Sequence, residues 1–218
     1  MPPRALSPSG ILLVDKPPGP TSFAIVAATR RRTGARTGHA GTLDPFATGL
    51  LLLLSGAATR LQPHFVGLDK RYVTEIDLTT RTSTGDTEGE IVEEHDPPAR
   101  SELEERLEGL RGAVELPIPA ASAVKIDGER AYKLYRRGVT VEMPVRRMQI
   151  HELELEAYDS GVVRLDLVVS SGTYVRSIAE TLGGHCRALR RTEIGPFSVD
   201  EADPEALIPP EEALARLA

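Results

Sequence analysis

The pattern of apolar and polar positions predicts several strands. Leu50–Leu54 is an unbroken apolar run of strand length, which is typical of a strand buried on both faces. Residues 70–79 alternate apolar or aromatic side chains with charged ones, as a half-buried strand does. Residues 149–157 and 162–170 alternate in the same way around Asp159-Ser160-Gly161, which predicts an antiparallel hairpin.

Helices are predicted between these strands. Thr21 or Ser22 is a suitable N-cap for a helix that continues to about Thr33. Its inward side chains are expected to be Phe23, Val26 and Ala27. The stretch Ser101-Glu-Leu-Glu104 is typical of a capping box and predicts a second helix with Leu103, Leu107 and Leu110 on one face. This order of elements predicts an α+β fold: a mixed, mainly antiparallel sheet with flanking helices.

Composition limits the class of protein. The chain has 218 residues and is 40% hydrophobic, enough for one large domain with a sizeable core. The single cysteine, Cys186, excludes an intramolecular disulfide and fits a reducing cytoplasm. The N-terminal residues lack the apolar core of a signal peptide, and Leu50–Leu54 is far shorter than the ~20 residues of a membrane span. We therefore expect a cytoplasmic protein with no membrane partner.

Charge is distributed unevenly along the chain. The net charge is −6, yet residues 1–71 hold nine Lys or Arg against three Asp or Glu. Such a basic half can bind a nucleic-acid backbone while acidic surface faces away. A cluster at the end of the first predicted helix consists of Arg30, Arg31, Arg32 and Arg36. It is either a solvated helix end, favoured by the helix macrodipole, or a set of phosphate contacts.

The stretch Gly38–Gly49 contains the strongest chemical signal. It reads Gly-His-Ala-Gly-Thr-Leu-Asp-Pro-Phe-Ala-Thr-Gly. Pro45 biases Asp44 towards extended or turn geometry, so the carboxylate is expected to project from an exposed turn. Alternatively, Asp44 is the N-cap of a helix that starts at Pro45. The glycines would allow a ligand to approach the backbone, and no Gly-Lys-Ser/Thr follows that would indicate a phosphate-binding P-loop.

These twelve residues closely resemble the catalytic motif of the TruB family of tRNA pseudouridine synthases. Three further stretches resemble the same family: Lys70-Arg71-Tyr72, Ser171–Arg176 and Leu189-Arg190-Arg191. The resemblance covers nearly the whole chain and implies a pseudouridine-synthase-like catalytic domain over residues 1–218. It implies that Asp44 is the catalytic residue.

The resemblance assigns roles to seven other residues. It implies substrate contacts for His39, Tyr72, Tyr174 and Leu189, with Tyr72 stacking on the target base. It implies supporting roles for Arg176, Lys16 and Asp86. Tyr174 and Arg176 are two residues apart, so in an extended segment both side chains would share one face, and we expect Arg176 to pair with Asp44.

Simpler interpretations remain open for three of these side chains. Tyr72 is also typical of a core or sheet-edge position, and Lys16 of a solvated charge at a strand end. Arg176 is equally typical of a structural salt bridge at a helix start, where a cation opposes the helix dipole and therefore calls for an acidic partner.

The resemblance also bears on domain organisation. Residues 115–145 are similar to a thumb segment that closes over RNA. The same stretch predicts an ordinary hairpin turn at Asp127-Gly128 followed by a surface helix. Many relatives continue into a small RNA-binding PUA domain, and we expect no complete one in this chain.

The implied reaction is the isomerisation of uridine to pseudouridine at position 55, in the T-arm loop of tRNA. It involves no net oxidation or hydrolysis, so no cofactor and no metal are expected, and no metal spacing or dinucleotide fingerprint is present in the sequence. No obligate protein partner is indicated. Two other classes stay open: a non-catalytic RNA-binding or RNA-folding module, and a nucleoside hydrolase.

Overall fold

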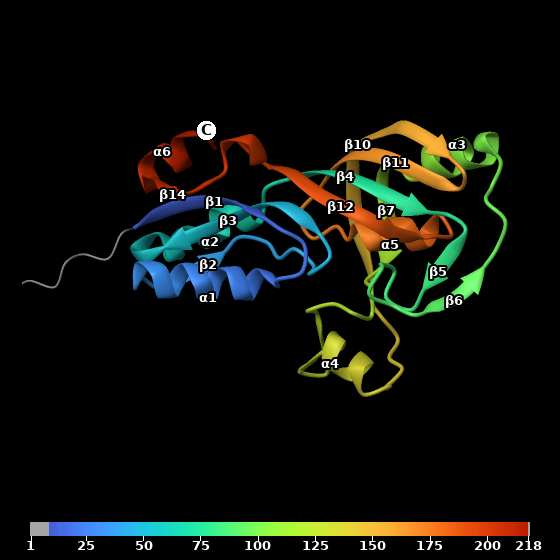
Figure 1. Cartoon of the computed structure of the whole chain (residues 1–218), viewed down its shortest axis with the longest axis horizontal. Helices are drawn as coiled ribbons and strands as arrows, with labels where there is room; N and C mark the ends of the chain where they lie inside the picture. The colour runs from blue at the N-terminus through green and yellow to red at the C-terminus, as the bar shows by residue number, and fades with distance from the viewer. Residues whose placement is uncertain (1–8, 218) are drawn as a thin grey trace, which may run out of the picture. The chain divides into compact units, whose positions relative to one another are not determined.

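The computed structural model describes residues 9–217, which form two compact units (Figure 1). Unit 1 contains the described residues up to Val73 together with those from Leu189 onward, and unit 2 contains Thr74–Ala188. The segment considered for a signal peptide lies mostly outside the described residues. The chain passes from unit 1 to unit 2 within one strand and returns within another.

Unit 1 is a layered arrangement of a sheet and short helices. Its strands are β1 (Gly10–Lys16), β2 (Thr37–His39), β3 (Thr48–Ser55), β13 (Phe197–Ser198), β14 (Asp203–Ile208) and parts of β4 (Lys70–Asp77) and β12 (His185–Ile194). Its helices are α1 (Ser22–Thr33), η1 (Gly56–Leu61), α2 (Gln62–Val66), η2 (Val199–Glu201) and α6 (Pro210–Ala215). The strand order is β14-β1-β3-β12, with β2 also paired to β3.

The leucine run forms the centre of unit 1. All five side chains of Leu50–Leu54 are fully buried in β3. Alternate leucines enter two different hydrophobic clusters, because successive side chains of a strand point to opposite faces. One cluster includes Val26 of α1, and the other includes Phe65 of α2 and Ala213 of α6, so helices cover both faces of this strand (Figure 1). The prediction of a strand buried on both faces is confirmed.

Helix α1 has the predicted cap but a different buried face. Thr21 accepts a hydrogen bond from the Ala24 amide and is the N-cap. The buried side chains are Ser22, Val26 and Thr29, whereas Phe23 is 75% exposed. The prediction that Phe23 points inward is therefore wrong. The buried side of α1 carries Ser22, whose hydroxyl donates a hydrogen bond to the Leu43 carbonyl, and Phe23 lies outside that side.

Unit 2 contains an antiparallel sheet and three helices. Its elements are β5 (Thr80–Thr82), β6 (Ile91–Glu94), α3 (Arg100–Glu108), β7 (Gly112–Pro117), β8 (Lys125–Ile126), β9 (Glu129–Arg130), α4 (Ala131–Arg136), β10 (Val145–Asp159), β11 (Val162–Val169) and α5 (Val175–Thr181), with parts of β4 and β12. Its main sheet has the order β4-β11-β10-β7. Strand β10 is antiparallel to both β11 and β7.

Two hairpin turns were correctly predicted from sequence. Asp159 pairs with Val162 across Ser160 and Gly161, both of which have positive φ angles. Asp127 and Gly128 connect β8 to β9, also with positive φ angles. Two successive left-handed residues are the hallmark of the tight turns that match the twist of a hairpin. Helix α4 follows directly, as the simpler interpretation of residues 115–145 requires.

The capping box predicted at Ser101 is wrong. Helix α3 begins at Arg100, so its N-cap is Ala99, two residues before the predicted Ser101, and Ala99 makes no side-chain capping bond. Arg100 instead pairs with Glu104 one turn later, at 2.9 Å between Nε and Oε1. Leu103, Leu107 and Leu110 are nevertheless buried, so the predicted apolar face of the helix is confirmed.

The fold class agrees with the sequence prediction. Most strand pairs are antiparallel, β12 runs parallel to β3, and helices flank the sheet. The fold is therefore α+β with a mixed, mainly antiparallel sheet. No helix within residues 9–217 has the length and apolar character needed to cross a membrane.

Candidate active site

Asp44 stands on a tightly held turn between β2 and β3. No helix follows it: Pro45 and Phe46 form a bend, and the Ala47 amide donates to the Asp44 carbonyl at 3.2 Å. The alternative that Asp44 is the N-cap of a helix starting at Pro45 is therefore excluded. Asp44 is partly exposed, while Leu43 and Ala47 on either side of it are buried. The turn thus presents a carboxylate from a backbone that is anchored in the core.

Side chains from three other elements hold this turn. Ser22 both accepts from the Leu43 amide, at 2.8 Å, and donates to the Leu43 carbonyl, at 2.9 Å. Lys16 donates to the Pro45 carbonyl at 3.1 Å. Arg191 donates to the carbonyls of Gly41 and Thr42, at 3.1 and 3.2 Å. The residues around Asp44 are therefore fixed before any substrate arrives, as catalytic preorganisation requires.

Lys16 has a buried structural role in this arrangement. Its side chain is fully buried, and its ammonium also donates to the carbonyls of Pro17 and Pro20, at 2.8 and 2.9 Å. The interpretation of Lys16 as a solvated charge is wrong. The burial also argues against direct RNA contact, and its position against Pro45 favours the supporting role.

Tyr72 and Leu189 are both nearly buried in unit 1. Tyr72 lies on β4 and Leu189 on β12, and each is 7% exposed. The Tyr72 hydroxyl lies 3.5 Å from Nη1 of Arg191, and the Tyr72 ring centroid lies 6.0 Å from the Arg191 guanidinium carbon. The same arginine therefore contacts the tyrosine and the Asp44 turn.

His39 occupies the end of β2, close in sequence to the turn. Its Nδ1 is buried and makes no hydrogen bond to any described residue. Burial, and then the positive charge of Arg191, lower the pKa of His39 below its usual value. The imidazole is therefore neutral near pH 7, a form suited to stacking against a base.

Lys70 is buried, as Lys16 is, and its burial was not predicted from the sequence. It is 6% exposed, and its ammonium donates to the carbonyls of Val66, at 2.7 Å, and Leu68. Burial, and then the charge of Arg191, lower the pKa of Lys70 from 10.5 to about 8, with Asp69 opposing the shift.

This lowered pKa predicts a pH-dependent stability. The unfolded chain binds more protons than the folded chain between the folded pKa of about 8 and the unfolded value of 10.5. The free energy of unfolding should therefore rise with pH across that window, relative to an uncharged Lys70→Met variant. Urea unfolding of both proteins from pH 7 to pH 10 measures the difference. A difference that stays constant above pH 8 would contradict the buried, partly neutral lysine.

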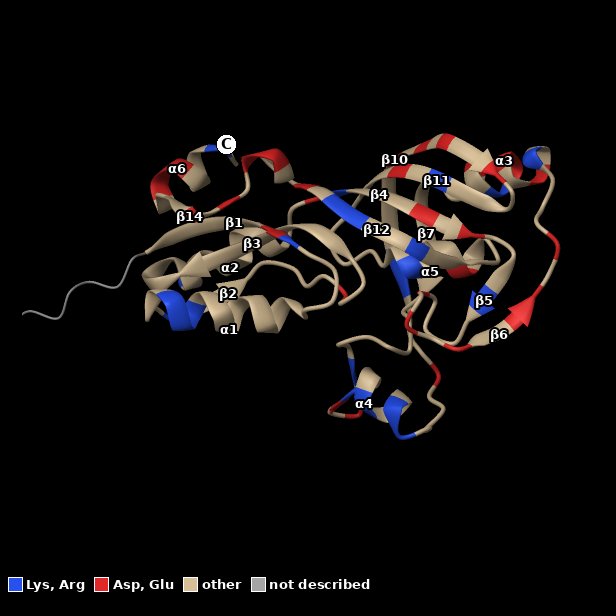
Figure 2. Ribbon diagram, in the orientation of Figure 1, with Lys and Arg blue, Asp and Glu red and all other residues tan. Residues whose placement is uncertain are grey.

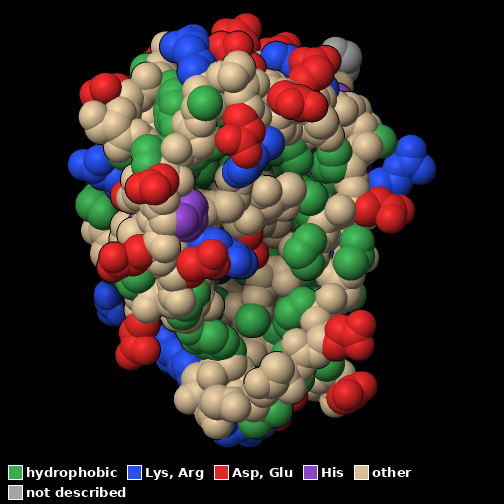
Figure 3. Space-filling model, turned by 90° about the vertical axis from the view of Figure 1, so that its right-hand side faces the viewer, with side chains coloured by type: hydrophobic (Ala, Val, Ile, Leu, Met, Phe, Trp, Pro, Cys, Tyr) green, Lys and Arg blue, Asp and Glu red, His purple; other side chains and the backbone are tan. Residues whose placement is uncertain are grey.

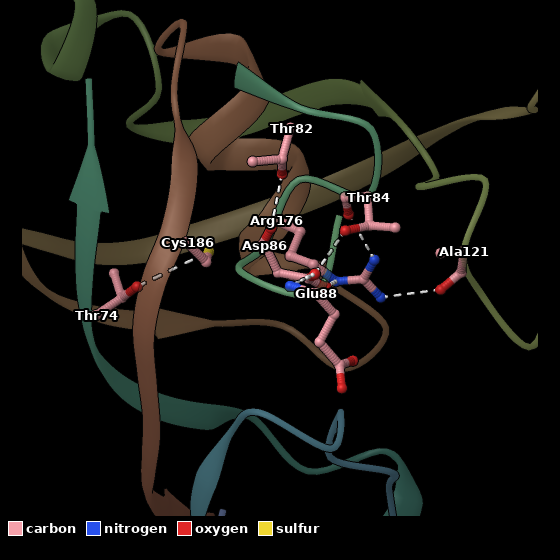
Figure 4. A network of polar contacts seen from close by, with 8 residues as sticks. All are labelled: Thr74, Thr82, Thr84, Asp86, Glu88, Ala121, Arg176 and Cys186. Carbon is pink, nitrogen blue, oxygen red and sulfur yellow. Dashed lines mark hydrogen bonds and ion pairs between the residues drawn. The ribbon is translucent and has the colours of Figure 1, made fainter. Parts of the chain in front are cut away.

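Two other candidate residues, Asp86 and Arg176, belong to a polar network in unit 2 (Figure 4). Arg176 is 2% exposed and its Nε lies 3.5 Å from Oδ2 of Asp86, which is also buried. Arg176 donates to the carbonyls of Thr84 and Ala121, at 2.9 and 3.1 Å. The other carboxylate oxygen of Asp86 accepts from the Thr84 hydroxyl at 2.6 Å and from the Glu88 amide at 3.0 Å. The predicted acidic partner of Arg176 at a helix start is thus present.

The prediction that Tyr174 and Arg176 share one face of an extended segment is wrong. The segment is not extended at this point: Tyr174 is the N-cap of α5, and Arg176 is the second residue of that helix. The shared-face argument for an extended chain therefore fails. Tyr174 is partly exposed, whereas Arg176 is buried at the positive end of the helix dipole.

The candidate residues thus form two groups. Unit 1 holds Asp44 with Lys16, His39, Tyr72 and Leu189, and unit 2 holds Asp86, Tyr174 and Arg176. The pairing of Arg176 with Asp44 stays a prediction. Within residues 9–217, no three His, Cys, Asp or Glu side chains are grouped so that they could hold a metal ion.

Comparison with solved structures defines the class of protein. A crystal structure of a Cbf5-Nop10-Gar1 complex matches 88% of this chain and 50% of the solved chain, with a TM-score of 0.68 and 27% identity. A crystal structure of a pseudouridylate synthase matches 98% of this chain and 76% of the other, with a TM-score of 0.53 and 17% identity. The fold is that of the pseudouridine synthases.

Sequence comparison narrows the class to a family. The family model for the N-terminal domain of the TruB family pseudouridylate synthases matches residues 29–175. A protein named tRNA pseudouridine synthase B from Leifsonia xyli subsp. xyli is 44% identical over an alignment that covers 94% of this chain and 74% of that protein. The chain belongs to the TruB family of pseudouridylate synthases.

Proposed function

We propose that this chain isomerises uridine to pseudouridine in tRNA, at position 55 in the T-arm loop. The observation that carries the proposal is the pinned turn that presents Asp44 within the family's catalytic motif. The relatives' name, tRNA pseudouridine synthase B, supports tRNA as the substrate. The chain would act as a single catalytic domain in the cytoplasm, with no obligate protein partner.

The proposed reaction suits a carboxylate. The base leaves C1′ of its ribose, turns, and reattaches through C5. An ionised carboxylate can attack as a nucleophile, remove a proton, or shield developing positive charge on the sugar. Each of these roles needs Asp44 fixed in place, which the bonds to its neighbours in the turn favour.

The other candidate residues would receive the target nucleotide. The uridine must leave its stack, at a cost of roughly a few kcal/mol. Tyr72 would stack on the base, an interaction worth ~1–3 kcal/mol, and its phenolic oxygen would take the C5 proton while the hydroxyl proton passes to solvent. Neutral His39 would occupy the vacated space, with Tyr174 and Leu189 contacting the nucleoside. Arg176, supported by Asp86, would pair with Asp44.

Product analysis tests this proposal against the two other classes. Purified protein is incubated with unmodified tRNA transcripts, and pseudouridine is mapped by position. The proposal expects pseudouridine at position 55, with the mass of the RNA unchanged. A nucleoside hydrolase would release free uracil, and a non-catalytic binding module would leave the RNA unaltered. Pseudouridine at another position alone would refute the site assignment.

Binding of tRNA is expected to be electrostatic, although the net charge of the chain is −6. The arginines at the end of α1 are Arg30, Arg31 and Arg32 (Figure 2). They lie about 14 Å along the helix from Ser22, which contacts the Asp44 turn, so they would bind phosphates away from the target base. The face seen in Figure 3 carries interspersed acidic and basic side chains, unlike this end of α1.

Reversal of these charges gives a direct test. The triple variant Arg30→Glu, Arg31→Glu, Arg32→Glu should weaken tRNA binding and reduce its salt dependence, because fewer counterions are released. Folding should persist, since the three arginines are exposed. The contacts of Arg32 are a surface pair with Glu205, worth about 0–1 kcal/mol, and an exposed hydrogen bond to the Pro204 carbonyl. Filter binding at several salt concentrations measures the effect. The control reverses three exposed arginines of unit 2, Arg100, Arg111 and Arg164, and so changes the net charge by the same amount. Equal losses in both proteins would mean that only net charge matters.

A further inference from the structure

Arg191 is a buried cation whose side chain spans the candidate site within unit 1. It is 1% exposed, yet it lies on β12 beside an exposed ion pair formed by its neighbour Arg190 with Asp15. Its Nε donates to the Leu50 carbonyl at 2.8 Å. A buried arginine is costly unless its donors are satisfied. Here they bind the carbonyls of Gly41 and Thr42 inside the catalytic motif and of Leu50 directly after it.

The contacts of Arg191 fall on both ends of the Asp44 turn. Before Asp44, Nη2 donates to Gly41 and Nη1 to Thr42, at 3.1 and 3.2 Å. After Asp44, Nε reaches Leu50, and the backbone of Arg191 pairs in register with Gly49. The guanidinium therefore ties the start of the motif to its end, with the catalytic carboxylate between them.

The two glycines fit this clamp. Gly49 has φ +99°, and a Cβ there would lie 2.2 Å from the Arg191 carbonyl oxygen. Gly41 has φ +101°, and a Cβ there would lie 3.6 Å from Nη1 of Arg191. Residues with a Cβ rarely adopt such φ angles. Glycine at both positions therefore allows the backbone of the motif to pack against Arg191.

The same guanidinium reaches Tyr72. Nη1 lies 3.5 Å from the Tyr72 hydroxyl oxygen, and the guanidinium carbon lies 6.0 Å from the ring centroid. A donor aimed at the phenolic oxygen directs the hydroxyl proton away from the arginine. One side chain thus sets both the Asp44 turn and the orientation of the Tyr72 hydroxyl.

We propose that Arg191 is a positioning residue for the isomerisation, holding the Asp44 turn and the Tyr72 hydroxyl in one fixed relation. The inference rests on the proposed function for its catalytic part. Arg191 need not touch the substrate, because its four hydrogen bonds all go to protein groups. The planar fork is essential, since a lysine ammonium in this place keeps the charge but cannot reach three carbonyls and a hydroxyl at once.

The first experiment compares Arg191→Lys with Arg190→Lys, an adjacent arginine that holds Asp15 rather than the turn. At saturating tRNA, Arg191→Lys should slow single-turnover pseudouridine formation by roughly 10²-fold, as expected for a misplaced catalytic group. Its tRNA affinity should stay close to that of the wild type. A wild-type rate, or a loss confined to affinity, would overturn the proposal.

A double-mutant cycle with Tyr72→Phe tests the hydroxyl link. Tyr72→Phe keeps the ring and removes the oxygen that Arg191 contacts. The double variant should lose less rate than the product of the two single losses, because one contact is removed in both. Independent, multiplicative losses would overturn the link. Should Arg191→Lys not fold, a wild-type rate for Tyr72→Phe would still overturn it.

A readout without substrate separates this inference from the proposed function. Hydrogen exchange of the Ala47 amide, which closes the turn on the Asp44 carbonyl, should be faster in Arg191→Lys and unchanged in Arg190→Lys. Unchanged exchange in a folded Arg191→Lys overturns the clamp even if the wild type proves inactive on tRNA. Faster exchange with an inactive wild type would leave the clamp standing and remove the proposed function alone.

Discussion

Asp44→Asn is expected to abolish pseudouridine formation, by roughly 10³-fold or more, while tRNA affinity stays near the wild-type value. The substitution keeps the shape of the side chain and removes its charge, which every proposed role of the carboxylate needs. The turn itself should survive, because its hydrogen bonds from Ser22, Lys16 and Arg191 go to neighbouring backbone groups rather than to this side chain. Single-turnover mapping with unmodified tRNA measures the rate.

The matched control is Asp200→Asn. Asp200 is an exposed aspartate of the same unit, on η2, and its loss should leave the rate unchanged. Thermal unfolding of both variants should remain close to that of the wild type. Turnover by Asp44→Asn at the wild-type rate would remove Asp44 from the chemistry, and a large loss of affinity would show that the carboxylate serves binding.

Local pattern was sufficient for much of the fold. The leucine run of β3 is continuous because both of its faces are covered, and few environments other than a doubly buried strand accept five successive leucines. The turns at Asp159-Ser160-Gly161 and Asp127-Gly128 were predictable because residues that tolerate positive φ angles are few. In these places local preference and tertiary environment agree.

Sequence reasoning failed where a tertiary hydrogen bond overrides hydrophobicity. Phe23 was expected on the buried side of α1. Ser22 occupies that side instead, bonded to the Leu43 carbonyl, and the aromatic ring of Phe23 is exposed. Asp44-Pro45 was expected to form an exposed turn, with a helix start as the alternative, and the turn is what the structure shows. The residues after it enter β3, whose pairing with β1 holds them extended. Leu43 is distant in sequence from Ser22, and β1 is distant in sequence from β3, so neither contact is visible in the local pattern.

Sequence reasoning did not identify Arg191 as a site residue because it is charged. An arginine is normally assigned to the surface, since it is rarely buried without partners. A signal was present: Leu189 and Arg191 are two apart on one strand, so a buried Leu189 predicts a buried Arg191. Lys70 gives the same signal two residues before Tyr72 on β4. Their carbonyl partners, however, come from segments that only the folded chain brings together.

Arg176→Ala is expected to damage both stability and turnover. Asp86 is buried, and Arg176 is the cation that its Oδ2 faces. Removal of one partner of a buried ion pair commonly costs about 3–5 kcal/mol, because the remaining charge is left in a poorly solvated place. Two hydrogen bonds to the carbonyls of Thr84 and Ala121 disappear as well. Arg164→Ala, which breaks surface pairs with Glu156 and Glu75, is the control and should cost little.

The stability lost in Arg176→Ala should depend on pH, and the pKa of Glu180 determines the direction of that dependence. Burial raises the pKa of Glu180, and Arg176 opposes that rise. Without Arg176 the pKa of Glu180 should rise further, so the folded variant gains a proton that the unfolded chain lacks. Stability of Arg176→Ala relative to wild type should therefore improve as pH falls from 7 towards 5. Denaturant unfolding at both pH values tests this; a constant or growing deficit at pH 5 would contradict it.

Turnover distinguishes the predicted pairing with Asp44 from a purely structural role. Arg176→Lys keeps the charge beside Asp86 but loses the planar fork, so it should recover much of the stability and only part of the rate. Both variants are assayed below their unfolding temperatures, at saturating tRNA, with affinity measured in parallel. If Arg176 orients Asp44, the rate at saturation falls far more than the affinity. A normal rate at saturating tRNA with weakened binding would instead make Arg176 a phosphate contact, and a normal rate with normal binding would confine it to holding the Asp86 loop.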